Sequence, residues 1–450
     1  MDILVIGSGG REHAFIKTLK RSEKVDQLYC APGNGGIAND AECITLNTHD
    51  EIVKFCTNEG IDLVVIGPEQ PLVDGLADDL RAANIAVLGC SKVAAQLEAS
   101  KDFTKKLCDE AGLPTAAYAT FDNIDAAKAH LKTQNMPIVL KADGLAAGKG
   151  VVIAHTKEEA ATALDDMFGG KFGAAGSKVV IEEFLEGEEL SFFALCDGER
   201  TIPFGSAQDH KAAYDGDKGP NTGGMGTYSP APIMTEALEK RIMEDIVHPT
   251  LHTMAQRGTP FSGILFVGLM VKDDMPKLVE FNVRFGDPET QVVLTRLQDD
   301  LADIFYHAAQ GKLPDTPARF SSDTALCVVM AAKGYPESYA KHTEINNVEQ
   351  AELIDGITVF HAGTALKDDI LLNVGGRVLG VTAVAGNVTQ AQAKAYRAVD
   401  AIDWKEGFCR RDIGWRAVKR ERKNSPLTQK ERAEALVQQG YGEAKAGGAS

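Results

Sequence analysis

Three polar residues in the second half of the chain alternate with apolar ones in a pattern that suits metal-assisted phosphoryl transfer. Glu280 and Asn282 lie two residues apart, so in a β-strand their side chains share a face. Val279 and Phe281 would point to the opposite face, which we expect to be the core. Two hard oxygen ligands, followed by Arg284, suit Mg²⁺ (or Mn²⁺) beside a transferring phosphoryl group. The alternative is an exposed strand face without a ligand.

A second candidate site combines a strand that ends on a lysine with a glycine-rich loop. An apolar run ends at Lys141, and the loop Gly144–Gly150 leads to the next apolar run. The loop differs from the GxxxxGK[ST] phosphate motif, because the spacing of Gly144 and Lys149 is wrong and no hydroxyl residue follows the lysine. We interpret it as a lid over a triphosphate, with Lys141 beneath it. A surface hairpin without a ligand is the alternative.

An acidic stretch after a third apolar run is a candidate for nucleoside binding. The apolar residues before Glu182 lead into Glu183, Phe184 and Leu185, and Glu188 follows. An apolar slot with backbone groups suits the edge of an adenine ring, and a carboxylate suits ribose hydroxyls. Taken alone, a solvated acidic turn is an equally good interpretation. The order of the three segments favours the nucleotide.

The glycines after the first apolar run place flexible backbone at the start of a helix, where anions bind. A dinucleotide fingerprint would need glycine at position 12, which is Glu12, and an acidic residue where the chain has Ala31–Gly36. A nicotinamide cofactor is therefore disfavoured. We favour a monophosphate, with Arg11 as an extra donor, over a glycine turn without a ligand. Glu69 follows another strand and would lie on the same sheet edge.

The segment from Asp209 onward adds further polar groups. Asp209 could hold an ammonium group, Lys211 a phosphate, and Gly219–Gly226 a second anion through its backbone. His248 and His252 lack the carboxylate of a zinc-binding HExxH motif, so we interpret them as ordinary helix residues.

The elements that must position these residues fall into three parts. Strands separated by helical patterns predict a parallel sheet in the first part. Its expected strands are Ile3–Ile6, Leu28–Ala31, Leu63–Ile66 and Ile85–Leu88. The central part is rich in strands, expected at Ile138–Lys141, Val151–Ala154, Val179–Glu183, Leu190–Leu195, Ile264–Val271 and Lys277–Val283. The third part has strands at Ala325–Ala331 and Arg377–Val384 and a helix at Gln390–Ile402.

Helix caps and composition complete the outline. We expect Asp50 and Ser100 to cap helices, and we expect domains at 1–100, 101–320 (with a lid subdomain at about 115–188) and 321–423, followed by a flexible tail at 424–450. The 450 residues carry a net charge of −17, which disfavours binding to nucleic acid or an anionic membrane. The eight cysteines form no CxxC pair, so neither a zinc knuckle nor a disulfide framework is indicated. Without a signal peptide or an apolar run of about 18 residues, we expect a cytoplasmic protein.

Taken together, the motifs resemble the phosphoribosylamine–glycine ligase family of the ATP-grasp superfamily over about residues 1–420. The resemblance rests on GSGGREH (7–13), APGN (31–34), GPEQPL (67–72), KADGLAAGKGV (141–151), EEFLEGEE (182–189), QDHK (208–211), GPNTGGMG (219–226), EFNVRFGDPE (280–289) and FCRRDIGWRA (408–417). It implies an α/β protein with an N-terminal Rossmann-like parallel-sheet domain, central ATP-grasp α+β domains and a C-terminal mixed α/β domain. The implied reaction is ATP-dependent ligation of glycine to 5-phosphoribosylamine through a glycyl phosphate, in purine synthesis.

The resemblance also implies roles for individual residues. Catalytic roles would fall to Lys141, Asp209 and Arg284, and metal binding to Glu280 and Asn282. ATP would be held by Lys101, Lys141, Gly144, Gly148, Lys149, Gly150, Glu182, Glu183, Phe184, Leu185 and Glu188. The two other substrates would be held by Gly9, Gly10, Arg11, Glu12, Asn34, Pro68, Glu69, Asp209, His210, Lys211, Asn221, Thr222, Gly223, Gly224, Arg284 and Asp287.

One departure from the wider superfamily concerns the metal. Many members have an acidic ligand on the strand before the Glu-x-Asn strand, but here that stretch, 266–271, contains no acid. Either water completes the coordination or another acid such as Asp287 contributes. We expect a monomer or a small homo-oligomer that binds neither nucleic acid nor a membrane. Another ATP-grasp carboxylate–amine or carboxylate–bicarbonate ligase, a nicotinamide-dependent dehydrogenase and a non-catalytic nucleotide-binding regulator are the competing hypotheses.

Overall fold

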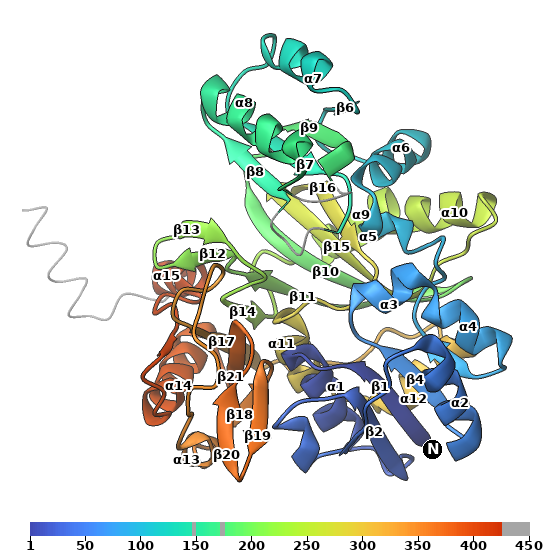
Figure 1. Cartoon of the computed structure of the whole chain (residues 1–450), viewed down its shortest axis with the longest axis vertical. Coiled ribbons are helices and arrows are strands. Elements are labelled where there is room, and N and C mark those ends of the chain that lie inside the picture. Colours follow the sequence, from blue (N-terminus) through green and yellow to red (C-terminus); the bar gives the residue numbers. More distant parts are fainter. Residues whose placement is uncertain (146–149, 172–175, 425–450) are drawn as a thin grey trace, which may run out of the picture.

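The computed structural model describes residues 1–145, 150–171 and 176–424. The N-terminal, central and C-terminal parts of the chain pack around α11 (Glu289–Arg296), and a smaller sheet stands away from this body (Figure 1). No helix within the described ranges is long and apolar enough to cross a membrane.

The N-terminal part is the expected parallel sheet, with strand order β3-β2-β1-β4-β5. Its elements are β1 (Asp2–Gly7), α1 (Gly10–Leu19), β2 (Gln27–Pro32), β3 (Glu42–Cys43), α2 (His49–Glu59), β4 (Leu63–Ile66), α3 (Glu69–Asp74), α4 (Leu76–Ala82) and β5 (Ala86–Leu88). The paired strands β1 and β4 end side by side, since the Gly67 N–H donates to the Ile6 carbonyl at 3.0 Å. The loops that start α1 and α3 therefore meet at one edge of the sheet.

Two helix starts test the expected caps. Helix α6 (Lys101–Ala111) is capped as expected by Ser100, whose side chain accepts the Phe103 N–H. Helix α2, however, is capped by Thr48, so the prediction for Asp50 is wrong. Thr48 accepts the Glu51 N–H at 3.2 Å, which leaves Asp50 in the first turn, where its charge still favours the helix dipole.

The small sheet that stands apart has the strand order β6-β9-β7-β8 and is antiparallel. Its elements are β6 (Tyr118–Phe121), α7 (Ile124–Leu131), β7 (Ile138–Ala142), β8 (Val151–Ala154), α8 (Lys157–Asp166) and β9 (Val179–Glu183). Helices α7 and α8 cover it at the top of Figure 1. Lys141 and Glu182 lie on the paired strands β7 and β9, and Lys141 reaches β16 (Met275–Asn282) of the large sheet through a hydrogen bond to the Val279 carbonyl.

One large sheet of nine strands runs through the central and C-terminal parts, in the order β16-β15-β10-β11-β14-β17-β21-β18, with β22 paired to β17. Its strands are β10 (Glu188–Asp197), β11 (Thr201–Asp209), β14 (Gly226–Ser229), β15 (Ser262–Lys272), β16 (Met275–Asn282), β17 (Thr324–Ala332), β18 (Ile357–His361), β21 (Arg377–Ala385) and β22 (Gly407–Phe408). Strands β11 and β14 pair at two positions, Gln208 with Tyr228 and Asp209 with Thr227. The halves of the sheet are therefore joined at the candidate site.

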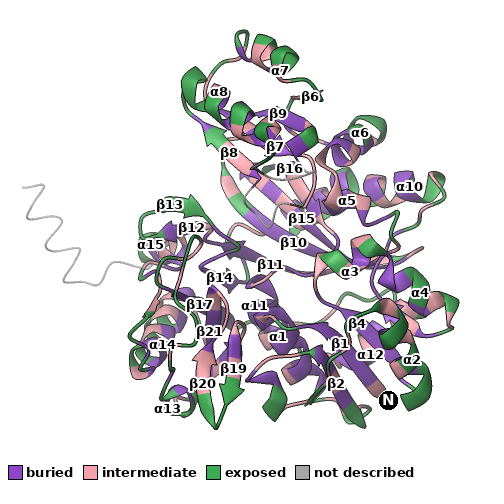
Figure 2. Cartoon of the chain, in the orientation of Figure 1, coloured by how far each residue is buried: buried purple, intermediate pink, exposed green. Residues whose placement is uncertain are grey.

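The remaining elements are helices and two hairpins. The helices are α5 (Gln96–Ala99), α9 (Glu236–Ile242), α10 (His248–Gln256), α12 (Leu301–Ala309), α13 (Val348–Glu352), α14 (Val388–Ala401) and α15 (Trp415–Asn424), and the hairpins are β12 (Ala212–Tyr214) with β13 (Lys218–Asn221) and β19 (Thr364–Lys367) with β20 (Ile370–Asn373). Buried residues concentrate in the nine-stranded sheet, α1 and α11, whereas hairpin tips and the outer helices are exposed (Figure 2). The expected tail lies outside the described residues from position 425 on, and α15 reaches residue 424.

Candidate active site

Strand β16 presents Glu280 and Asn282 on one face, as the alternation predicts, and Phe281 is buried on the other. The prediction that Val279 also lies in the core is wrong. The pairing with β15 shifts register, so that Leu278 pairs with Leu269 and Val279 is skipped. Leu278 takes the core position, and the Val279 carbonyl instead accepts a hydrogen bond from Lys141 Nζ at 3.0 Å.

Glu280 lies in a positive field. Burial alone would raise the pKa of its carboxyl, but the charges of Lys101, Lys141 and Lys211 outweigh burial and lower the pKa. The described residues contain no group of three or more His, Cys, Asp or Glu that could hold a metal. A carboxylate and an amide oxygen on one face, with few other protein ligands, fit Mg²⁺ that keeps water and substrate phosphate in its coordination shell.

Lys141 is buried and already paired. Its Nζ lies 3.0 Å from Glu182 Oε2, and Lys105 Nζ lies 3.4 Å from the same oxygen. Lys105 was not identified from the sequence. Glu182 Oε1 is buried and has no hydrogen-bond partner among the described residues. Buried acceptors are almost always satisfied in proteins, so this oxygen is suited to a donor from a ligand.

The residues expected around a nucleoside lie where β9 passes into β10. Glu183 is exposed and pairs with Lys277 at 3.2 Å, and half-buried Phe184 and Leu185 follow it. Glu188 begins β10, and its Oε1 lies 2.8 Å from Arg420 Nη2 of the last helix. Arg420 was not identified from the sequence.

The other expected nucleotide residues are distributed as follows. Lys101 begins α6, and its Nζ donates to the Glu98 carbonyl at 3.2 Å. Gly144 adopts φ +149°, and the Gly150 carbonyl accepts the Ala142 N–H at 2.8 Å, so β7 and β8 stay paired up to the loop. Gly148 and Lys149 lie outside the described residues.

Arg284 joins the strand to the N-terminal part through two carboxylates. Its Nη2 lies 2.7 Å from Glu98 Oε1 and its Nε 3.2 Å from Glu69 Oε2. Nη2 also lies 3.4 Å from Asn282 Oδ1. Burial raises the pKa of Glu98 although Arg284 opposes it. Glu69 remains acidic, because Arg284 and Arg11 outweigh its burial and lower its pKa.

The glycine loop before α1 is closed by the protein's own carboxylates. Glu12 is buried; its Oε2 accepts the Gly9 N–H at 2.5 Å and its Oε1 accepts Arg11 Nε at 2.6 Å. Asp287 Oδ2 accepts the Arg11 N–H at 3.3 Å, and Arg11 Nη1 donates to the Phe285 carbonyl at 3.1 Å. Arg11 and Glu12 therefore serve the loop's own structure, and Asp287 faces this loop.

Buried Asp209 and half-buried Lys211 form a second charged pair, with Asp209 Oδ2 3.1 Å from Lys211 Nζ. Burial raises the pKa of Asp209, and burial with the charge of Asp209 raises the pKa of Glu289. Burial alone would lower the pKa of Lys211, but Asp209, Glu189 and Glu289 raise it. Asp209 Oδ1 is a second buried acceptor without a partner in the part of the chain that the structure describes.

The loop after Lys211 folds over Asp209. Thr222 Oγ1 donates to the Lys211 carbonyl at 2.8 Å, and a Cβ on Gly224, at φ +115°, would lie 2.8 Å from both Asp209 oxygens. Asn221, by contrast, is exposed at the end of β13. His210 is buried and accepts the Gly414 N–H at 3.1 Å, so the C-terminal segment is hydrogen-bonded to this loop.

Arg377 of β21 is a further residue missed from the sequence. It donates from Nη1 to the carbonyl oxygens of Gly223 at 2.6 Å and Asp287 at 2.5 Å. Tyr335 accepts the Gly223 N–H at 3.3 Å. The C-terminal part therefore contributes directly to the loops that surround Asp209.

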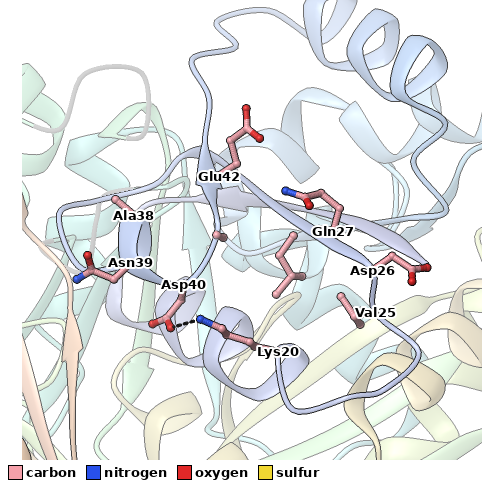
Figure 3. Close-up of a pocket in the computed structure, with 10 residues that line it drawn as sticks. Lys20, Val25, Asp26, Gln27, Ala38, Asn39, Asp40 and Glu42 are labelled. Carbon is pink, nitrogen blue, oxygen red and sulfur yellow. Dashed lines mark hydrogen bonds and ion pairs between the residues drawn. The ribbon is translucent and has the colours of Figure 1, made fainter.

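The remaining expected residues are structural in their contacts. Asn34 donates to the carbonyls of Ser8 and His361 at 2.9 and 2.8 Å, and Pro68 precedes α3 at its N-cap. His248 and His252 lie on α10. A separate hollow of about 370 Å³ opens at the amino ends of β2 and β3, where Lys20 pairs with Asp40 (Figure 3). It contains none of the candidate residues.

Comparisons with known proteins show the family of this chain. Three protein-family models of phosphoribosylglycinamide synthetase match the sequence. They are the N domain over residues 1–98, the ATP-grasp (A) domain over 99–290 and the C domain over 325–416. The chain belongs to the phosphoribosylglycinamide synthetase family. Phosphoribosylamine–glycine ligase of Brucella melitensis is 55% identical over 426 residues, which cover 94% of this chain and all of that protein.

Solved structures agree with the family assignment. A crystal structure of phosphoribosylamine–glycine ligase from Thermotoga maritima has a TM-score of 0.81 and 32% identity, covering 92% of this chain and 100% of that one. The biotin carboxylase domain of Hydrogenobacter thermophilus 2-oxoglutarate carboxylase, in complex with MgADP, has a TM-score of 0.67 at 16% identity, covering 90% of this chain and 91% of that one. At that identity the second likeness concerns the fold alone. The expected fold class is confirmed.

Proposed function

We propose that this chain ligates glycine to 5-phosphoribosylamine with ATP, giving glycinamide ribonucleotide, ADP and phosphate in de novo purine synthesis. The observation that carries the proposal is the 55% identity to a phosphoribosylamine–glycine ligase over 94% of the chain. The charged residues around β16 support it, because phosphoryl transfer depends mainly on positioning and on stabilisation of negative charge.

The reaction proceeds in two steps. A carboxylate oxygen of glycine attacks the γ-phosphorus of ATP, the bond to the β-phosphate oxygen breaks, and ADP leaves with that electron pair. The amine of phosphoribosylamine then attacks the carbonyl carbon of the glycyl phosphate. Phosphate leaves with the electron pair of the C–O bond, and the amine loses a proton as the amide forms. No protein nucleophile is needed.

Lysines and Arg284 supply the positive charge for both steps. Lys101 and Lys141 hold ATP phosphates, and Arg284 lies where the acyl phosphate forms. Glu280 and Asn282 would hold Mg²⁺ (or Mn²⁺), which neutralises phosphate charge when bound. Since Lys141 pairs with Glu182 here, phosphate binding would add a second anion to a lysine that is already oriented.

In this proposal the adenine and ribose of ATP bind to residues between the end of β9 and the start of β10. Glu182 Oε1 is suited to accept the adenine amine, and Glu183, Phe184 and Leu185 line the ring. Glu188 accepts the ribose hydroxyls. The loop that includes Gly144, Gly148, Lys149 and Gly150 covers the phosphates in this proposal.

In this proposal glycine and phosphoribosylamine bind on the side of β16 that faces the N-terminal part of the chain. Asp209 Oδ1, which lacks a partner among the described residues, is suited to the glycine ammonium group. The glycine loop before α1, with Asn34, Pro68 and Glu69, faces phosphoribosylamine, and Arg11 and Glu12 shape that loop. Lys211, Thr222, Gly223, Gly224 and Asp287 close the opposite side.

The remaining proposals concern location, assembly and domains. We propose a cytoplasmic monomer or small homo-oligomer that acts on small molecules and, in line with its net charge of −17, binds neither nucleic acid nor an anionic membrane. We also propose the domains 1–100, 101–320 and 321–423, with 115–188 as the lid subdomain. The second candidate is another ATP-grasp ligase of nucleotide synthesis, of the carboxylate–amine or carboxylate–bicarbonate type, which would share the fold and the phosphate-binding charges.

The deciding experiment measures ADP and phosphate release from ATP and Mg²⁺ with glycine, with and without freshly generated phosphoribosylamine. One ADP per amide, dependent on both substrates, is the expected result. Release with glycine alone would support acyl phosphate formation but leave the acceptor open. Release that depends on bicarbonate and not on glycine would favour the second candidate.

A further inference from the structure

The last described helix reaches the residue proposed to bind ribose. Arg420, in the second turn of α15, places Nη2 2.8 Å from Glu188 Oε1, although the two residues are 232 positions apart. The other carboxylate oxygen, Glu188 Oε2, lies 3.5 Å from Gln208 Nε2, and Gln208 in turn accepts the hydroxyl of buried Tyr228 at 3.1 Å. The ribose-side carboxylate is thus approached from the C-terminal part of the molecule.

Helix α15 does not depend on Arg420 for its own attachment. Glu421 accepts the N–H groups of Val388 at 2.8 Å and Thr389 at 3.0 Å, which fixes α15 to the start of α14. Arg416 pairs with Asp217 at 2.6 Å. These contacts hold the helix in place, so the contact of Arg420 with Glu188 is not needed to attach α15.

The second terminal nitrogen of Arg420 is unusual. Nη1 is buried, yet it has no hydrogen-bond partner within the described ranges. Buried N–H groups without a partner are rare in native proteins, and each needs an explanation. Nη1 belongs to the same rigid, planar guanidinium as Nη2, so it lies within reach of a group bound by Glu188.

We propose that Arg420 is a ribose-binding residue of the nucleotide site, which orients Glu188 through Nη2 and donates to a ribose hydroxyl through Nη1. This inference rests on the proposed function, since it takes Glu188 as the ribose ligand. A hydroxyl both donates and accepts, so one ribose hydroxyl can donate to Glu188 and accept from Arg420. A deoxynucleotide without this hydroxyl leaves Glu188 paired with Nη2 but gives the buried Nη1 no partner.

The pairing has a consequence for specificity. Sites built to hydrogen-bond a hydroxyl reject analogues without it, because the site's buried polar groups are left unsatisfied. With two charged partners on one hydroxyl, Arg420 and Glu188 should together set the preference for ATP over deoxyATP. The C-terminal part would thereby contribute to nucleotide recognition, beyond its support of the loop after Lys211.

The test compares the binding of ADP, 2′-deoxyADP and 3′-deoxyADP, each with Mg²⁺, by isothermal titration calorimetry on the full chain. Arg420→Met removes the guanidinium but keeps much of the side-chain length. Lys419→Met removes the same charge from the neighbouring, exposed position of α15 and is the matched control. We expect wild type and Lys419→Met to prefer ADP over one deoxy analogue by about tenfold or more. Arg420→Met should bind ADP about tenfold more weakly and lose that preference.

A second variant separates a ribose contact from a structural role. Adding Glu188→Gln to Arg420→Met should cause little further loss of ADP affinity, because the two residues bind the same group. Equal weakening of all three nucleotides by Arg420→Met, with the wild-type preference kept, would overturn the inference. So would unchanged binding by Arg420→Met. Failure of the wild-type chain to bind ADP would instead contradict the proposed function.

Discussion

At the scale of residues, the candidate site consists of buried charges that are paired before any substrate binds. Glu182 holds Lys141 and Lys105, whereas Glu98 and Glu69 hold Arg284. Such pairing fixes side-chain orientation, so little reorganisation is needed when phosphate charge arrives. Seven buried side-chain atoms lack partners in the described part of the chain, and three of them, on Glu182, Asp209 and Arg420, belong to residues proposed to bind substrate atoms.

Glu280→Gln should lower turnover by roughly a hundredfold or more while the fold is kept. The amide is the same size as the carboxylate but removes the anion that Lys101, Lys141 and Lys211 surround. ADP release at saturating substrates and the melting temperature would measure the two effects. Glu186→Gln, an exposed carboxylate that pairs with Lys272, is the control and should keep full activity. Near-wild-type activity of Glu280→Gln at low Mg²⁺ would contradict the metal assignment.

At the scale of elements, the register of β16 and the fold of the loop after Lys211 decide which groups meet. Alternation within a strand is local, so Glu280 and Asn282 could be found from sequence. The register shift opposite Gly268 could not, because it depends on the partner strand β15. Glu98 was missed for a similar reason: it pairs with Arg284 across 186 residues, and nothing in its own short helix points to that contact.

Gly224→Ala should reduce activity by at least about tenfold without weakening ADP binding. The position has φ +115°, which alanine rarely adopts, and the added Cβ would lie 2.6 Å from Pro288 Cδ as well as against Asp209. Steady-state kinetics with varied glycine would locate the defect on the Asp209 side. Gly216→Ala, in the same region at φ +72°, is the control for backbone strain alone, because its added Cβ would meet only Lys218 Cε, at 3.8 Å. Equal losses in the two variants would argue against a local effect at Asp209.

His210 lies between the Gly-rich loop and the C-terminal segment. It should make the free energy of unfolding depend on pH. Burial, together with the charge of Arg410, lowers its pKa from 6.5 to about 4. Between these values the unfolded chain takes up a proton that the folded chain does not, so the contribution of His210 is complete above pH 6.5 and is lost as the pH falls toward 4.

The difference in melting temperature between wild type and His210→Asn should therefore be largest at pH 7 to 8 and shrink toward about pH 4.5. Scans at several pH values would measure it. His252→Asn, at an exposed position of α10, is the matched control. A constant difference for His210→Asn would mean that the buried ring is not the group that titrates.

At the scale of the whole molecule, the site exists only where three parts of the chain meet. Asp287 contacts the loop before α1 through Arg11, and its carbonyl accepts Arg377 of β21. The fold class and many of the strands were readable from sequence, because those strands carry an apolar pattern of their own. The order of the strands within each sheet was not predicted. Arg377 and Arg420 were not predicted either, because they act on segments that only the folded chain brings to them.

Arg377→Met should raise KM for phosphoribosylamine by about tenfold while leaving ADP affinity unchanged. The substitution releases the carbonyls of Gly223 and Asp287, which belong to the loops proposed to close over the two other substrates. Kinetics with freshly generated phosphoribosylamine, alongside calorimetry with ADP, would separate the two. Arg397→Met, exposed on α14, is the control. A loss of ADP affinity equal to the rise in KM would show a general disturbance instead.

The shared sheet has a consequence for how this chain can be divided or recombined. Strand β17 pairs with β14 along Gly226–Ser229, so a cut near residue 320 leaves an unpaired strand edge on each fragment. Exposed edges recruit other strands, and the two pieces would reassociate or aggregate instead of persisting as independent units. A chimera that exchanges the C-terminal part between relatives must therefore preserve this strand pairing. For the stability of such a chimera, the pairing of β14 with β17 matters more than the covalent linker between the parts.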